Sequence, residues 1–436
     1  MKKASVRETQ NRALMEDVKS VLAHREWINA TTHGTIDRTR VLGIVAAGKG
    51  AENYLPYTIP KIIRQISEMG KGADLIIGLN NGFECPPLQR LTVLPNVHVI
   101  HLYTEEKWTS TTPARSFADY QCEGGPYHLT NTDLARATHR IFVVHQRAGP
   151  HSPGKIRVLG DIYGSLVVES IQNGWIPPGI LVTFDAESQF FGLQEGGIPE
   201  WESNGLMLLV SKLQASPEID LLGARSRYAV YRKELIDGIE VHLPDFREEP
   251  PPLQRFLYAV HGRYRGYQWK PGGGTVGRTD VMISLLVVIA SRYPGIRNED
   301  VHLSILAQHA GFRGDIVTDA VSTNRVPIIT DLTADEPPQP VWVQQMSRWM
   351  ASVHALELHY GRHNVGAIVC TGFPWMISKD LMGFRRRFQG MEKTSLLTMR
   401  RTIGALWMAF AAFQKIKRKV SERPDLLRGP QANASW

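Results

Sequence analysis

The chain has 436 residues, of which 43% are hydrophobic and 21% charged, a composition typical of a globular protein with one or two hydrophobic cores. It contains no apolar run near the roughly 20 residues of a membrane-spanning helix, no apolar segment of a secretory signal and only three scattered cysteines. We therefore expect a cytoplasmic protein without a disulfide framework or a cysteine metal site.

The net charge of +8 is concentrated near the carboxyl terminus. Residues 379–428 contain 13 Lys or Arg against 4 Asp or Glu, a local net charge of +9, so that the rest of the chain is close to neutral. This distribution argues against nucleic acid as a partner and indicates a basic carboxyl-terminal surface.

Apolar periodicity predicts the elements in chain order. Residues 1–30 have helical spacing, and from residue 40 onward β-rich runs alternate with helical stretches. Strands are predicted over 40–47, 73–79, 97–103, 179–188 and 221–231, and helices over 59–70 and 155–174. This alternation predicts an α/β fold, Rossmann-like, with a mostly parallel central sheet flanked by helices. The His and aromatic residues of 101–151 suit either an acceptor-side insertion or plain loops.

Proline-rich stretches indicate where the chain divides. TADEPPQP (333–340) precedes a long, helical and increasingly basic segment, whereas REEPPPLQR (247–255) fits a surface connection. We expect an amino-terminal helical segment at 1–38, an α/β domain at 39–335, a helical basic carboxyl-terminal region at 336–428 and a disordered tail at 429–436.

The segment FDAES (184–188) places two acids at the end of an apolar strand. If the strand continued, Asp185 and Glu187 would point to the same side. Two such carboxylates can hold Mg²⁺ or Mn²⁺ on a diphosphate. A strand-end turn with two solvated acids explains the pattern equally well.

A second acidic pair begins a helix in NEDVHLSILAQHAGFRGDI (298–316). Asp300 can act as a general base at the mouth of a site, with Glu299 beside it. Acids in a first helical turn are also favoured by the helix dipole alone, which is the competing explanation.

Two further motifs carry weaker signals. In WKPGGGTVGRTDVM (269–282), Gly273 and Gly274 allow close backbone approach to a ligand, and Thr279 or Asp280 can cap the helix that follows, although a simple turn fits as well.

In QQMSRWM (344–350), Arg348 offers a cation for phosphate, and Trp349 a flat face for a sugar. A tryptophan packed into the core is the alternative.

Taken together in this order, the motifs resemble the inverting family 2 glycosyltransferases with the GT-A fold, over roughly residues 40–350. GGGTVGRTDVM…YPGIRNEDVHLSILAQHAGFRGDI is the most specific part of the resemblance. The resemblance implies a hexosyltransferase-type enzyme (EC 2.4) that uses a nucleotide sugar, with a UDP-sugar expected, Mg²⁺ or Mn²⁺ as cofactor, and an acceptor that the sequence leaves open.

By the same resemblance, the DxD-like pair Asp185 and Glu187 binds the metal ion, and Asp300 is the catalytic base. Glu299 and the QxxRW residues Gln345 and Trp349 are placed on the acceptor and sugar side. The residues expected on the donor side are Ala46, Glu52, Asn80, Asn81, Lys155, Asp185, Gly273, Gly274 and Arg348.

The sequence departs from the family pattern at three points. GLNNG (78–82) stands where many relatives carry an acidic motif that faces the nucleoside, and the DxD-like motif ends in Glu. QxxRW is best known from processive, membrane-embedded synthases, and because this chain has no spanning segment, processivity is not carried over.

Two other functions remain open. VAAGKGAENYLPYTIPK (45–61) is similar to the opening signature of sugar-nucleotide pyrophosphorylases, which would make the protein a sugar-1-phosphate nucleotidyltransferase. That signature needs an Arg soon after its second glycine, and none follows before Arg64. The other alternative is a non-catalytic nucleotide- or carbohydrate-binding protein that kept the fold.

The basic carboxyl-terminal region contains one amphipathic segment. Residues 393–419 place apolar side chains near one helical face, flanked by Arg400, Arg401 and KIKRK. Such a helix can lie on an anionic membrane surface, making the protein peripheral on the inner face, or can pack on the domain with its basic end in solvent.

Overall fold

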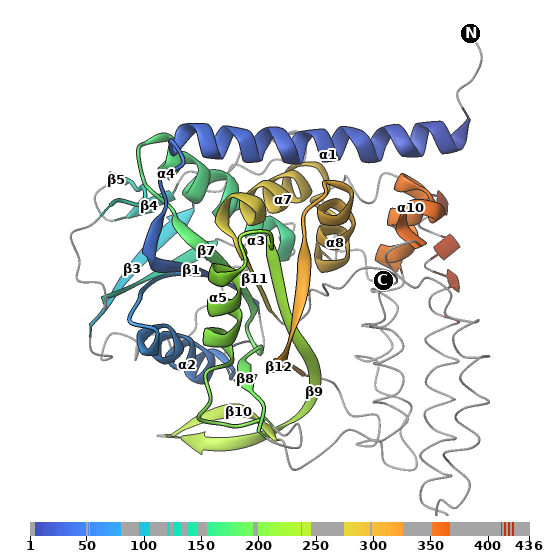
Figure 1. Cartoon of the computed structure of the whole chain (residues 1–436). Coiled ribbons are helices and arrows are strands. Elements are labelled where there is room, and N and C mark those ends of the chain that lie inside the picture. Colours follow the sequence, from blue (N-terminus) through green and yellow to red (C-terminus); the bar gives the residue numbers. More distant parts are fainter. Residues whose placement is uncertain are drawn as a thin grey trace, which may run out of the picture.

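The computed structural model describes residues 5–48, 51, 53–79, 96–104, 120–122, 125–131, 138–146, 155–194, 199–236, 238–245, 274–296, 299–325 and 351–366, with seven more between 411 and 422. Within these ranges the chain forms a 12-stranded sheet with helices on both faces (Figure 1). This arrangement confirms the predicted α/β fold. None of the helices in these ranges is long and apolar enough to cross a membrane.

The sheet is mixed but mostly parallel. Its strands are β1 (Asp37–Ala47), β2 (Gly72–Leu79), β3 (Val97–Thr104), β4 (Tyr120–Cys122), β5 (Gly125–Pro126), β6 (His139–Gln146), β7 (Pro178–Asp185), β8 (Phe190–Gly192), β9 (Leu221–Ile236), β10 (Ile239–Asp245), β11 (Gly274–Arg278) and β12 (Gly314–Arg325).

Their order is β5-β4-β3-β6-β2-β1-β7-β11-β9-β12-β8, with β10 paired to β9. The run β3-β6-β2-β1-β7 is parallel throughout, whereas β11 is antiparallel to both of its neighbours. The carboxyl ends of the five parallel strands therefore share one edge, where open α/β sheets bind ligands.

The helices form a layer on each face of the sheet. They are α1 (Val6–Thr31), α2 (Leu55–Glu68), α3 (Lys155–Asp161), α4 (Val168–Gln172), α5 (Gly205–Ala215), α7 (Thr279–Arg292), α8 (Glu299–His309) and α10 (Arg362–Gly366), with a π-helical segment at Ile162–Val167 and a further helical stretch at 351–360.

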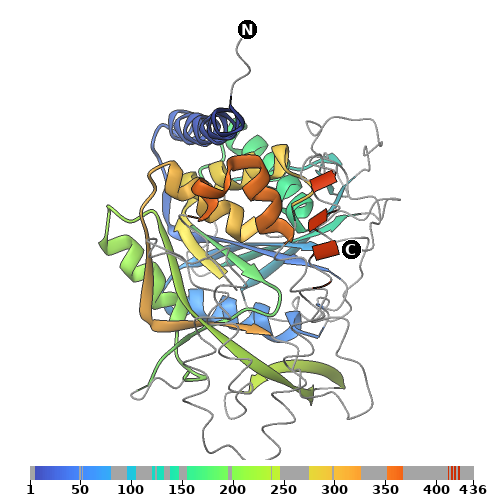
Figure 2. The same cartoon turned by 90° about the vertical axis from the view of Figure 1, so that its right-hand side faces the viewer.

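The two faces of the sheet bury separate cores (Figure 2). Adjacent residues of a strand point to opposite faces, so on β1 Val41 packs in the core with α2 and α5, while Leu42 packs in the core with α7 and α8. Both are fully buried. Because helices cover both faces of the sheet, the sequences of the parallel strands are nearly continuous apolar runs, without alternation of apolar and polar residues.

Three sequence expectations need correction. The strand predicted over 179–188 ends at Asp185, because the chain turns there and the Ser188 N–H donates to the Asp185 carbonyl at 2.8 Å. The region 101–151 is more than an insertion or loops, since β6 lies inside the sheet between β3 and β2. The helix after the glycine loop is capped by neither Thr279 nor Asp280, because its N-cap residue is Arg278, without a side-chain cap.

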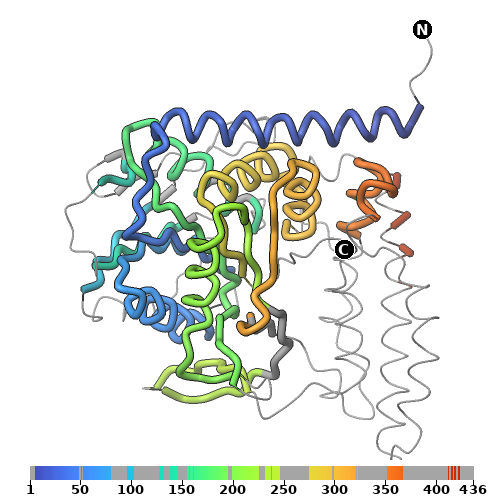
Figure 3. The backbone as a smooth tube through the Cα atoms, viewed as in Figure 1, coloured from blue at the N-terminus to red at the C-terminus, as the bar shows by residue number. Residues whose placement is uncertain are grey.

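The predicted helix near the amino terminus is confirmed as α1, which lies across α7 and α8 on the outside of the molecule (Figure 3). It begins at a capping box in which Glu8 N–H donates to Ser5 Oγ at 3.2 Å and Ser5 N–H donates to Glu8 Oε2 at 2.7 Å. Leu14, Val18 and Val21 on its inner face are buried, as the helical spacing predicts.

A buried carboxylate joins α1 to the helices beneath it. Asp17, 1% exposed, accepts hydrogen bonds from the hydroxyl of Tyr293, the C-cap residue of α7, and, at 2.5 Å, from the Tyr360 hydroxyl. The Tyr360 hydroxyl in turn lies 2.7 Å from Nε2 of His302 on α8. Burial lowers the pKa of His302 to about 3, so this imidazole is neutral in the folded protein.

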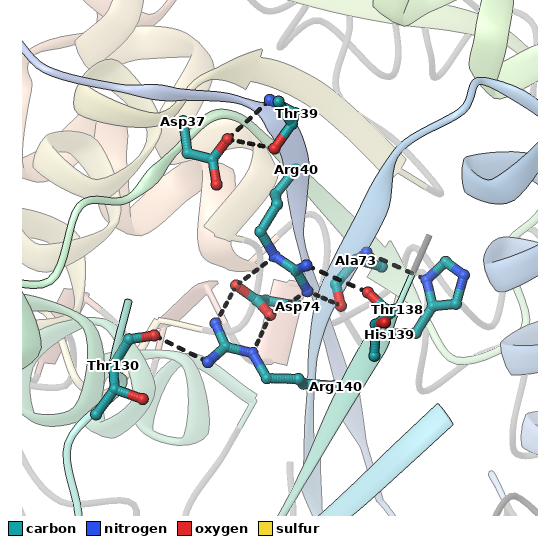
Figure 4. A network of polar contacts seen from close by, with 9 residues as sticks. All are labelled: Asp37, Thr39, Arg40, Ala73, Asp74, Thr130, Thr138, His139 and Arg140. Carbon is teal, nitrogen blue, oxygen red and sulfur yellow. Dashed lines mark hydrogen bonds and ion pairs between the residues drawn. The ribbon is translucent and has the colours of Figure 1, made fainter. Parts of the chain in front are cut away.

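A second buried charge cluster holds the amino ends of three central strands (Figure 4). Asp74 of β2 accepts from Arg40 of β1, at 2.8 Å from Nη2 to Oδ1, and from Arg140 of β6, at 2.7 Å from Nε to Oδ1. The two guanidinium groups also donate to the carbonyls of Ala73, Thr138 and Thr130. All three charged side chains are buried, and each is satisfied by several partners.

We expect Asp74→Asn to lower the free energy of unfolding by about 3–5 kcal/mol, because it leaves two buried guanidinium groups without a counter-charge. The midpoint of urea denaturation measures this loss. Asp315→Asn, which removes one charge from the half-exposed Lys212–Asp315 pair, is the matched control and should leave the midpoint nearly unchanged. Equal midpoints for Asp74→Asn and the wild type would contradict the stabilising role of the cluster.

Candidate functional site

Three residues expected on the donor side lie together at the carboxyl edge of the sheet. Asp185 ends β7, and its register partner on the neighbouring strand β1 is Ala46. On the other side of β7, Gly274 of β11 is the register partner of Phe184. The backbone at Gly274 has a φ of 158° and passes close to the Phe190 ring, so that a Cβ would meet that ring at 2.6 Å.

The turn after β7 is fixed by side chains from other elements. The Thr58 hydroxyl of α2 donates to the Ala186 carbonyl at 2.9 Å, and the Tyr231 hydroxyl of β9 donates to the Glu187 carbonyl at 2.6 Å. Because the strand has already ended, the strand geometry that would align Glu187 with Asp185 does not continue. Tyr231 is a contributor that the sequence patterns did not single out, since its position on a long strand carries no local signal.

Lys155 connects two of the acidic residues of the site. Its side chain leaves the start of α3, and its ammonium group contacts Oδ1 of Asp185 and Oε1 of Glu299. The three residues come from α3, β7 and α8, so the cation joins the strand that ends at the edge of the sheet to the helix that carries the second acidic pair. The two carboxylates raise the pKa of Lys155 well above its usual range, against the opposing effect of burial.

Asp300 follows Glu299 in the first turn of α8. Its Oδ1 accepts a hydrogen bond from the Val301 N–H at 2.8 Å. Burial first, and then the negative charge of Glu299, raise the pKa of Asp300 to about 7, while the positive charge of Lys155 opposes them. A carboxylate with a pKa near neutrality is suited to accept a proton from a hydroxyl group.

Tyr163 lies in the π-helical segment at Ile162–Val167, directly after α3, the helix that begins with Lys155. Its side chain is fully buried, and its hydroxyl has no hydrogen-bond partner among the described residues. Burial raises the pKa of Tyr163 well above its usual range, and the positive charge of Lys155 acts in the opposite direction. Sequence spacing did not indicate Tyr163, because the extra residue of a π-turn shifts it from a regular helical position.

The structure therefore brings together Ala46, Lys155, Asp185, Gly274, Glu299 and Asp300, with Glu187 in the adjoining turn. The other predicted site residues lie outside the described residues, namely Glu52, Asn80, Asn81, Gly273, Gln345, Arg348 and Trp349. The same holds for residues 393–410 of the basic amphipathic segment and for the tail at 429–436.

The carboxylates of the site can hold a divalent ion whose remaining coordination positions are filled by a ligand. Carboxylates from two separate elements, Asp185 and Glu299, converge on a single cation, the ammonium of Lys155. No group of three or more His, Cys, Asp or Glu side chains that could enclose a metal ion occurs in the part of the chain that the structure describes. Mg²⁺ and Mn²⁺ bind readily through one or two carboxylates when substrate phosphates complete the coordination shell.

Comparison with known proteins gives similar structures but no similar sequences. No protein-family model matches the sequence, and no curated protein is significantly similar to it. The chain is similar to a solved mannosyltransferase from Pyrobaculum calidifontis in complex with GDP-Man and Mn²⁺, with 11% identity, a TM-score of 0.42, and coverage of 96% of this chain and 99% of that one.

It is also similar to TarS 1-349 from S. aureus, with 7% identity, a TM-score of 0.40, and coverage of 91% of this chain and 90% of that one. The same TarS fragment in complex with UDP gives 10% identity, a TM-score of 0.34, and coverage of 88% and 91%. TM-scores this low establish no activity, so a function has to come from the residues of the site.

The charges around Asp300 predict opposite pKa changes in two variants. Glu299→Gln removes a negative neighbour and should lower the pKa of Asp300 from about 7, whereas Lys155→Met removes a positive neighbour and should raise it. Carbon-13 NMR of the labelled aspartate carboxyl groups, recorded in metal-free buffer, follows both titrations. Lys212→Met is the control and should leave the titration in place, and a shift of the same sign in the two test variants would contradict this electrostatic description.

Proposed function

We propose that this protein is a glycosyltransferase of the hexosyltransferase type, which moves a sugar from a nucleotide-sugar donor, with a UDP-sugar expected, to an acceptor hydroxyl with inversion. The observation that carries the proposal is the convergence of Lys155, Asp185, Glu299 and Asp300 at the carboxyl edge of the sheet. These residues lie where open α/β sheets bind ligands. They combine a cation with carboxyl groups in different environments, which is what the transfer of a group from a diphosphate requires.

Asp300 has the properties that a general base needs at neutral pH. With a pKa of about 7, close to half of it is ionised at that pH and it holds a proton strongly enough to draw one from a hydroxyl. Glu299, by contrast, is already paired with the ammonium of Lys155. The geometry therefore favours Asp300 over Glu299 as the residue that accepts the proton.

The proposed reaction is a single displacement. The acceptor oxygen forms a bond to the anomeric carbon as the bond from that carbon to the diphosphate oxygen breaks, and the acceptor proton moves to the Asp300 carboxylate. Attack from the face opposite the leaving group inverts the anomeric configuration. The products are the glycosylated acceptor and the nucleoside diphosphate, which keeps the bonding electrons.

A divalent ion, Mg²⁺ or Mn²⁺, held by Asp185 would add positive charge to the departing diphosphate. As its second carboxylate we propose Glu299, in place of Glu187 that the sequence motif named, because Glu299 shares the ammonium of Lys155 with Asp185 whereas Glu187 lies beyond the end of β7. Lys155 can donate to the same phosphate oxygens, since its side chain is 40% exposed and thus open to a ligand. Arg348 and Trp349 keep the roles that the sequence motif predicts for them, on the phosphate and on the sugar.

The direct test measures nucleotide release with a panel of UDP- and GDP-sugars, with a mixture of glycans, lipid carriers and small hydroxyl compounds as acceptors. We expect turnover with at least one donor, and about 10²–10⁴-fold slower turnover in Asp300→Asn with donor binding retained. Asp319→Asn makes the same chemical change at an exposed site on β12 and should leave the rate unchanged. Near-normal turnover in Asp300→Asn would contradict the assignment of the base.

The pH dependence gives an independent measurement. Below its pKa, Asp300 carries a proton and cannot accept another, so kcat/KM should fall about tenfold per pH unit below that pKa and level off above it. The pKa is about 7 without a metal ion, and a bound divalent ion should move this acid limb to lower pH. This acid limb should be absent from the residual activity of Asp300→Asn. Release of pyrophosphate from a nucleoside triphosphate and a sugar 1-phosphate, without any transfer, would support the nucleotidyltransferase alternative instead.

A further inference from the structure

We infer that Lys155 is a built-in counter-cation of the donor site, which holds Asp185 and Glu299 together before a ligand arrives and leaves them when a divalent metal ion binds. This inference deepens the proposed function and rests on it for the identity of the ligand. In this role Lys155 competes with the metal ion for the carboxylates of Asp185 and Glu299, in addition to contacting the donor.

The ion pairs of Lys155 join two elements that are distant in the chain. Asp185 ends β7 and Glu299 begins α8, yet both carboxylates contact the same ammonium nitrogen. Two like charges so close to a common point repel each other unless a cation lies between them. Lys155 supplies that cation from the protein itself, at the place where a metal ion bound by both carboxylates would have to lie.

Lys155 keeps hydrogen-bonding capacity while it is paired with the two carboxylates. An ammonium group has three N–H donors, and two acceptors, Asp185 and Glu299, account for its contacts with the described residues. The side chain is 40% exposed, so it is not enclosed on every side, and the third donor remains for a ligand oxygen.

The charge balance explains why the displacing group has to be a metal ion. Asp185, Glu299 and the ionised form of Asp300 outnumber the single cation Lys155 among the described residues of the cluster. A nucleoside diphosphate adds further negative charge and would be repelled. A divalent ion that enters with the diphosphate restores the balance and releases Lys155 to donate to the phosphate oxygens.

The decisive measurement is the affinity for Mn²⁺ alone, without nucleotide, read from the electron paramagnetic resonance signal of free Mn²⁺. Because the competing ammonium is gone, full-length Lys155→Met should bind Mn²⁺ about tenfold more tightly than the wild type, or tighter still. The matched control is Lys212→Met, which removes a lysine of similar exposure from its ion pair with Asp315, and it should bind Mn²⁺ like the wild type. Unchanged or weaker binding in Lys155→Met would overturn the inference.

A second measurement uses the wild-type chain and does not depend on how a variant folds. Lysine labelling with an amine-reactive reagent, quantified by peptide mass spectrometry, reports how accessible each ammonium is. MnCl₂ alone should increase the labelling of Lys155 relative to that of Lys212, because the metal ion displaces Lys155 from its carboxylates. Constant or reduced labelling of Lys155 would show that the ammonium stays in place, and the inference would fail.

These outcomes are separable from those of the proposed function. If no donor in the panel is turned over but Lys155→Met binds Mn²⁺ more tightly, the glycosyltransferase proposal fails and the counter-cation role stands. If a donor is turned over with and without chelator, and Lys155→Met gains no affinity for Mn²⁺, transfer proceeds with Lys155 itself as the cation and the displacement is refuted.

Discussion

The burial of Asp74 between two arginines is the constraint on which the rest of the sheet depends. Arg40, Asp74 and Arg140 lie at the amino ends of β1, β2 and β6, and each guanidinium group can satisfy the carboxylate in only one register of these strands. Both faces of these strands are buried, so a slip by one residue would keep apolar side chains in the two cores but leave the buried charges unpaired. Because the strands are rigid, fixing their amino ends also fixes where their carboxyl ends deliver residues to the site.

Much of the framework could be predicted from the sequence because its signals are local. The apolar runs of β1 and β2, the helical spacing of α1 and the acidic start of α8 are each visible within about a dozen residues. β6 was missed because its apolar core, IFVV, is short and flanked by His and Gln, and only its neighbours β2 and β3 identify it as an interior strand. The π-helical segment was invisible for a similar reason, since nothing in the composition of IYGSLV breaks the helical pattern.

The acidic residues of the candidate site could be predicted from the sequence, whereas the ion pairs between them and Lys155 could not. Asp185, Glu299 and Asp300 follow from motif spacing, but the contact of Lys155 with two of them depends on the packing of α3 against α7 and the sheet. The raised pKa of Asp300 likewise depends on burial and on charges from three elements. The sequence thus named both the carboxylates and Lys155, whereas the two ion pairs that connect them depend on the tertiary structure.

The carboxylate of Asp17 has a consequence for the order in which the protein assembles. Its partner Tyr360 is 343 positions away along the chain, and Tyr360 also contacts His302, two residues beyond Asp300 on α8. During synthesis, α1 leaves the ribosome long before Tyr360 exists, so the buried face of α1 has to wait for the last of its partners. Long-range contacts of this kind form late because a long loop must close first. The helix that carries Asp300 is thus secured only when nearly the whole chain has been made.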